Sequence, residues 1–157
     1  MKTTKHISLL IISIICMASC NFNSPVKEGN HQALHSYIGT SVIDSGYYES
    51  EATVVDFITS DSIAGAYMVY FHDTKFAEKM PQMDIIIDGI VCTAPNTYQC
   101  DSIVPDMVMG IMRIPVPKYL IRNLKLFITS DNMGTHMNMH MLCGPYNLDY
   151  TGTYEGD

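Results

Sequence analysis

Residues 119–142 read YLIRNLKLFITSDNMGTHMNMHML, and this stretch decides the fold class. In its first half, Leu124, Leu126 and Ile128 share one strand face, opposite Asn123 and Lys125. Residues 135–142 alternate methionines with His and Asn in the same way. Successive side chains of a strand point to opposite faces, so this alternation is typical of half-buried β-strands. The Asp-Asn-Met-Gly segment between the two runs is typical of a turn.

The same alternation recurs along the chain, in runs rich in β-branched and aromatic residues with turn residues between them. Strands are expected near residues 37–44, 49–59, 65–76, 83–92, 98–104, 119–130, 135–142 and 147–154. Helices are expected to be few, because only residues 77–80, just before Pro81, offer a candidate. About eight strands with short links predict an all-β fold, either a sandwich or a small antiparallel up-and-down barrel. We favour the barrel because closure removes unpaired strand edges.

Length and composition exclude several classes of protein. The chain has 157 residues, of which 47% are hydrophobic and 16% charged, which suits one domain and argues against disorder. The net charge of −7 argues against a nucleic-acid partner, because phosphate binding needs a basic surface. Coiled coils and polytopic membrane proteins are also excluded by the composition.

The first 19 residues have the pattern of a secretory signal peptide. Two lysines precede an apolar run at residues 7–18, which at about 12 residues is too short to span a bilayer. The run ends in Met17-Ala18-Ser19 before Cys20, which resembles the bacterial lipobox, where the cysteine receives a diacylglycerol. We therefore expect Cys20 to be lipidated; the alternative is an ordinary signal peptide that happens to contain a cysteine.

Cleavage before Cys20 would divide the chain into a signal peptide at residues 1–19, a flexible tether at 20–34 and a barrel domain at 35–157. Seven basic residues would remain against sixteen acidic ones, a net charge of −9. A domain this acidic would not adhere to anionic lipids through its own side chains, so the acyl chains would have to hold the protein at the membrane. The expected location is the bacterial cell envelope, at the outer membrane.

Six short motifs occur in an order that resembles a known family. They are residues 75–81 (KFAEKMP), 83–90 (MDIIIDGI), 103–105 (IVP), 119–124 (YLIRNL), 141–146 (MLCGPY) and 150–153 (YTGT). Together they resemble the calycin-like β-barrel domain found in many lipoproteins of Bacteroidetes, over residues 37–153. The resemblance implies a lipocalin-related barrel on a lipid anchor, and it supplies no reaction, ligand or catalytic residue. The methionines at 107, 109 and 112 depart from the family pattern.

The predicted barrel interior is a candidate binding site for a small apolar molecule. Strand alternation turns one face of each run inward, and methionine can repack around differing apolar guests. The interior residues are Phe57, Leu124, Leu126, Met137, Met139 and Met141. A solid core would need the same residues, so both alternatives stay open.

Metal and disulfide chemistry have weaker candidates. His136 and His140 lie on one strand face about 13 Å apart, too far to share a copper ion, so we expect no metal site and no cofactor. Cys92 and Cys100 flank a predicted hairpin loop and could form a disulfide in an oxidising compartment if their Cα atoms lie within about 7 Å. Cys143 would then be a buried thiol.

Three function classes come into question, and the third, an enzyme, is not expected because the chain has no recognisable nucleophile, acid–base or phosphate-binding motif. The first is a lipid-anchored protein whose barrel binds a small hydrophobic ligand. The second is a surface interaction module, in which a solid barrel supports loops that bind protein or glycan. The most suitable loop is residues 106–118, which carry Met107, Met109, Ile111 and Met112 near Pro115 and Pro117.

Overall fold

The computed structural model describes residues 34–156, except residues 45 and 77. Ten strands make up this part of the chain: β1 (His35–Ile43), β2 (Tyr48–Thr59), β3 (Tyr67–Thr74), β4 (Met83–Ala94), β5 (Thr97–Ile103), β6 (Asp106–Met109), β7 (Met112–Pro115), β8 (Ile121–Asp131), β9 (Gly134–Cys143) and β10 (Tyr146–Tyr154). A short 3-10 helix, Pro117–Tyr119, precedes β8. The helix expected at 77–80 is not formed, since residues 78–80 are a turn and Ala77 lies outside the described residues.

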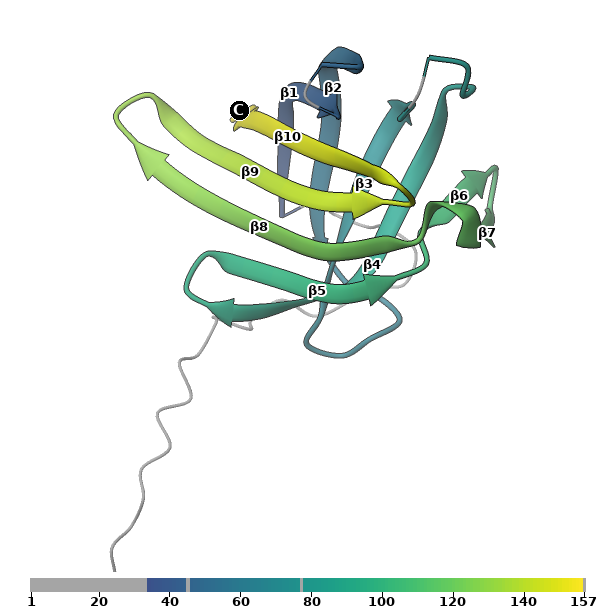
Figure 1. The fold of residues 1–157 in the computed structure, drawn as a ribbon. Helices are drawn as coiled ribbons and strands as arrows, with labels where there is room; N and C mark the ends of the chain where they lie inside the picture. The colour runs from purple at the N-terminus through teal and green to yellow at the C-terminus, as the bar shows by residue number, and fades with distance from the viewer. Residues whose placement is uncertain (1–33, 45, 77, 157) are drawn as a thin grey trace, which may run out of the picture. The chain divides into compact units, whose positions relative to one another are not determined.

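Eight of the strands close into an antiparallel barrel, as predicted (Figure 1). Around the barrel the order is β1-β2-β3-β4-β5-β8-β9-β10, and β10 pairs with β1 to close the circle. All eight expected strands are present, with ends within about two residues of the predicted ones. Because chain neighbours are also barrel neighbours, the topology is up-and-down.

Strands β6 and β7 were not predicted, because the segment at residues 106–118 was interpreted as a loop. They form a hairpin that lies outside the barrel circle (Figure 1). Strand β6 pairs with the start of β4, where Asp84 lies opposite Val108, and β7 pairs only with β6. Four-residue strands bounded by prolines are too short to show a clear period-two pattern.

Strand β4 contains a bulge between the part that pairs with β5 of the barrel and the part that pairs with β6 of the hairpin. The β3–β4 register slips by one residue between the pairs Tyr67–Ile90 and Met68–Asp88, and Gly89 between them has φ +109°. Glycine adopts this backbone conformation without a Cβ clash. Beyond the bulge β4 pairs with β5, and before it β4 pairs with β6.

The antiparallel register gives the barrel two distinct ends. At one end of the barrel, here called the entry end, the described chain begins at Leu34. The β8–β9 turn lies at the same end, as the pairing of β1, β10, β9 and β8 shows. The β9–β10 turn and the β6–β7 turn lie at the other end, here called the hairpin end. The β6–β7 turn therefore lies at the opposite end from Leu34.

A buried tyrosine ties β1, β2 and β10 together inside the barrel. The Tyr150 hydroxyl lies 3.1 Å from the carbonyl oxygen of Tyr37 and 3.2 Å from that of Thr53. Burial raises the pKa of Tyr150 well above its ordinary value, so this hydroxyl stays protonated and is the hydrogen-bond donor to these carbonyl oxygens. The ring also lies over Gly152, where any side chain would collide with it.

We expect Tyr150→Phe to lower the free energy of unfolding by about 1–3 kcal/mol, because buried carbonyl oxygens lose their donor while the ring packing is kept. Urea denaturation followed by circular dichroism measures the change. A matched control is Tyr146→Phe, since Tyr146 is only partly buried. Equal midpoints for the two variants would contradict a stabilising role for the buried hydroxyl.

Candidate functional site

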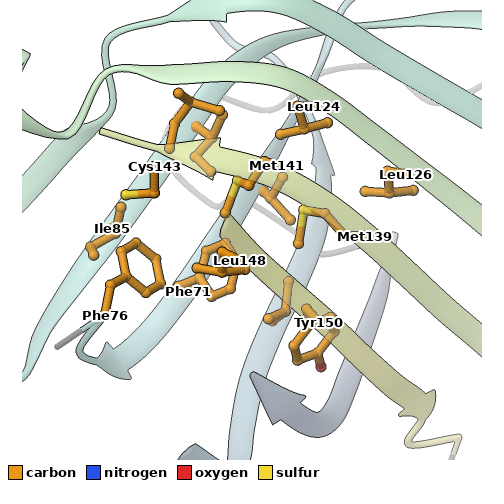
Figure 2. Close-up of a cluster of buried hydrophobic side chains, with 14 of the residues drawn as sticks. Phe71, Phe76, Ile85, Leu124, Leu126, Met139, Met141, Cys143, Leu148 and Tyr150 are labelled. Carbon is orange, nitrogen blue, oxygen red and sulfur yellow. The ribbon is translucent and has the colours of Figure 1, made fainter. Parts of the chain in front are cut away.

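The six residues predicted to line the interior all lie inside the barrel. Phe57, Leu124, Leu126, Met137, Met139 and Met141 are at most 3% exposed and belong to one buried cluster. Figure 2 shows Leu124, Leu126, Met139 and Met141 pointing toward Leu148 and the other core side chains. The alternation of β8 and β9 thus places these residues as predicted.

The interior is filled by these side chains. At the entry end, the Phe57 ring lies 5.1 Å from Tyr67 and 4.8 Å from Tyr98 between ring centroids. At the hairpin end, a cavity lined by Phe76, Met80 and other apolar residues measures only about 10 Å³. A site for a drug-sized ligand needs roughly 300 Å³. The structure therefore favours the solid-core alternative over an internal binding site.

Ionisable groups inside the barrel stay neutral. Burial raises the pKa of Tyr37 to about 12 and that of Cys143 to about 12. Burial, with a smaller contribution from Asp101, also raises the pKa of Cys100 to about 11. Desolvation penalises the charged form of each group, so none of the three is a nucleophilic anion at neutral pH.

The β6–β7 hairpin packs by one face onto the outside of the barrel. Outward-facing Ile58, Met68 and Ile86 form a second buried cluster, and Val108 of the hairpin packs against it. Arg113, directly across from Val108, forms ion pairs with a barrel carboxylate and a loop carboxylate. Its guanidinium nitrogens lie 3.5 Å from Asp88 and 3.2 Å from Asp61.

The end of the same hairpin is apolar and exposed. Met109 and Met112 lie opposite each other, and the two-residue turn between them contains Gly110, whose φ is +62°. Two-residue hairpin turns need a residue with positive φ, which glycine supplies. Ile111 is fully exposed, while Met109 and Met112 are each more than half exposed. We call Met109, Ile111 and Met112 the hairpin tip.

Charge around the hairpin differs from the rest of the chain. Residues 107–130 contain no Asp or Glu, although the whole protein has a net charge of −7. Four of the nine basic residues fall in this stretch: Arg113, Lys118, Arg122 and Lys125. The apolar tip therefore lies in a stretch of sequence without acidic residues, in which Arg113 is paired with Asp61 and Asp88.

The outer face of β2–β4 carries a polar network that engages the carboxylates of Asp56, Asp84 and Asp88. Asp56 accepts hydrogen bonds from Ser36 at 2.5 Å and contacts His72 at 2.7 Å. The Tyr70 hydroxyl donates to Asp84 at 2.7 Å, and its pKa is raised to about 12 by burial and by this carboxylate. Ser36 bonds to the carboxylate and not to the imidazole, so the three side chains do not form a nucleophile–base pair.

Two acidic residues of β4, Asp84 and Asp88, point outward but are covered by neighbouring side chains. Asp84 accepts from Tyr70 and from the backbone N–H of Asp73, at 2.8 Å. Asp88 has a 12% exposed side chain, accepts from Ser62 and pairs with Arg113. Asp84 is covered from β3, and Asp88 from the β2–β3 loop and the hairpin, which the pattern of β4 alone does not reveal.

The cysteine pair does not form the disulfide that was considered. Both residues are thiols in the structure, and Cys92 lies opposite Tyr98 in the β4–β5 ladder. Cys100 is therefore a diagonal neighbour of Cys92, and diagonal positions lie about 7–8 Å apart. This is beyond the usual Cα separation of a disulfide, about 4.4–6.8 Å.

The histidines of β9 engage separate partners. His136 contacts Asp131 and Thr153, each at 3.3 Å, and His140 contacts Asp149 at 2.7 Å. Among the described residues, no three His, Cys, Asp or Glu side chains are grouped as metal ligands. The outward alternation of β9 separates the two rings as predicted.

Cys20 lies outside the described residues, so its lipidation stays a prediction, as does the boundary of the tether. Within residues 34–156 no helix has the length and apolar character needed to span a bilayer. Comparisons with protein-family models, curated proteins and solved structures find no match to this chain.

Proposed function

We propose that this protein is a lipid-anchored envelope lipoprotein whose solid barrel supports a protein-binding hairpin. The observation that carries the proposal is the fully exposed Ile111, flanked by two exposed methionines, on a barrel whose interior is filled. Residues of this kind are costly to leave in water as a group and mark interaction sites when they cluster. A filled interior leaves the outside as the place for binding.

The bracing of the hairpin supports this role. Val108 and Arg113 fix its other face to the barrel, through the outer apolar cluster and two ion pairs. A tip held in one conformation loses little entropy on binding, and pre-organisation of this kind strengthens association. The methionines at its sides are flexible enough to fit an irregular partner surface.

The partner we propose for the tip is a protein. The described chain begins at Leu34 at the entry end, and the tip lies at the opposite end. The lack of acidic residues in 107–130 suits a partner with an apolar centre and an acidic rim.

Site-specific photocrosslinking in the native host tests this proposal. We expect a crosslinker at position 111 to give a discrete protein adduct, and one at position 133 to give none. Met133 is the matched control because it is also apolar and exposed, at the β8–β9 turn of the entry end. Met112→Asp, which puts a charge in the tip, should reduce the adduct at position 111 at least tenfold. Lipid adducts, or equal adducts from both positions, would contradict a protein-binding tip.

Replacing Cys20 with Ala tests the anchor separately. Without the thiol no diacylglycerol can be attached, so we expect the protein to move from the membrane fraction to the soluble fraction of the envelope. Metabolic labelling with a radioactive fatty acid, compared between the wild type and Cys20→Ala, measures acylation directly. Cys92→Ala is the control and should leave both properties unchanged. Unchanged membrane association of Cys20→Ala would overturn the anchor but leave the hairpin proposal standing.

A further inference from the structure

A hollow of about 280 Å³ lies on the outer face of β5, β8 and β9, away from the hairpin tip. Its lining residues are Gln99, Cys100, Asp101, Asn123, Leu124, Lys125 and His140. A bulge in β8 shapes it, because the β8–β9 register slips between the pairs Arg122–Leu142 and Lys125–His140. Asn123 within the bulge has φ +53°. Bulges of this kind bend a strand, redirect its side chains and are frequent beside functional sites.

Four of the polar side chains around this hollow have no recorded hydrogen-bond or ion-pair partner, whereas the fifth, His140, contacts Asp149. Within the described part of the chain, Gln99, Asp101, Asn123 and Lys125 make no side-chain hydrogen bond or ion pair that the structure records. The face of β2–β4 differs, because its carboxylates at 56, 84 and 88 are all engaged. Four polar groups of complementary type without a recorded partner thus surround one hollow.

The charges of the hollow select the kind of ligand. Asp101 and Lys125 carry opposite charges, so an anion would be repelled by the first and a cation by the second. One carboxylate is also too few for a calcium or magnesium site. The amides of Gln99 and Asn123 offer both donors and acceptors, which suits hydroxyl groups. A neutral ligand with several hydroxyls satisfies all four side chains.

An exposed aromatic ring lies on the same face of β8 as the hollow, next to its lining residues and not among them. Phe127 is 42% exposed on β8, two residues beyond Lys125 and therefore on the same face. It lies between Thr97 and Asn138 on the neighbouring strands. An aromatic ring beside polar groups can contact the C–H face of a sugar while the polar groups bind its hydroxyls. We propose that this hollow binds one neutral hexopyranose unit of a glycan.

The size of the hollow agrees with a single sugar ring, because sites for drug-sized molecules begin at roughly 300 Å³. A methyl hexopyranoside has few atoms, so its expected dissociation constant is about 1 mM. The site shares no residue with the hairpin tip. The proposal therefore stands or falls independently of the protein-binding function.

The test is a titration of the full-length mature protein, isotope-labelled, with the methyl α-pyranosides of glucose, galactose and mannose. We expect at least one to cause saturable amide shifts at Gln99, Asp101 and Lys125. Asp101→Asn removes a charged acceptor with little change of shape and should weaken binding about tenfold. Asp131→Asn removes the same charge at the end of β8, outside the hollow, and should change nothing.

Three results would overturn the site. One is the absence of saturable shifts at these amides with all three sugars up to about 20 times the expected dissociation constant. Another is equal affinity of Asp101→Asn and the wild-type protein for the sugar that binds. The third is a response to glucuronate or phosphate without a response to the neutral sugars, which would make the hollow an anion site.

Discussion

Gly39→Ala is expected to lower the free energy of unfolding by more than about 4 kcal/mol, a large part of the stability of a small domain. Gly39 and Gly152 lie directly opposite each other on β1 and β10, where the barrel closes. A Cβ added at Gly39 would lie 2.0 Å from the carbonyl oxygen of Thr151 and 2.4 Å from the Cα of Gly152. Both are backbone atoms of a hydrogen-bonded ladder, so neither can move aside without breaking the closure.

Urea denaturation of Gly39→Ala beside Gly156→Ala measures this effect. At Gly156 a Cβ would meet only the ring of Tyr154, at 3.1 Å, and this exposed side chain can turn away. We expect Gly156→Ala to change the free energy of unfolding by less than about 0.5 kcal/mol. Similar midpoints for the two variants would show that β1 and β10 do not approach each other this closely.

Met139→Trp is expected to lower the free energy of unfolding by about 3 kcal/mol. Met139 is buried between Leu126 of β8 and Tyr150 of β10, its cross-strand neighbours, within the filled core (Figure 2). Inserting a larger side chain into a close-packed interior forces its neighbours out of their preferred rotamers. A barrel with a ligand cavity would instead accept the indole and lose only its ligand.

The control for this substitution is Met139→Leu, which conserves volume and should cost less than about 1.5 kcal/mol. Thermal and urea unfolding of both variants give the comparison. A tryptophan variant as stable as the leucine variant would mean that the core has spare room near β9. In that case the internal ligand site would again be the better explanation of the methionine-rich strand.

The barrel strands could be predicted from the sequence because each has one buried face and one exposed face. Thr53, Val55 and Phe57 are all buried, as the alternation of β2 indicates, and Asp56 points outward. Such strands show a strong period-two signal over seven residues or more. Strand number and up-and-down topology then follow from the short links between the runs.

The hairpin and the outer hollow could not be predicted in the same way. In residues 106–115 two short strands lie between Pro105 and Pro117. Apolar side chains occur on both faces of this hairpin, because Val108 packs against the barrel whereas Met109 is exposed to solvent. The hollow depends on the bulge at Asn123, where the register between β8 and β9 slips. Such a slip cannot be predicted from the sequence of one strand alone. Both features arise from pairing between segments, so local sequence patterns do not contain them.

The central claim is that the barrel is solid and that binding occurs outside it. Mass spectrometry of the protein purified gently from its own host, under native and then denaturing conditions, tests this most directly. Covalent groups such as acyl chains appear in both spectra, whereas a ligand held in the core appears only in the native one. The account predicts that the native spectrum shows no small molecule that is absent from the denatured one. An additional small apolar molecule that is present in the native spectrum, absent from the denatured one and lost in Met139→Trp would contradict it.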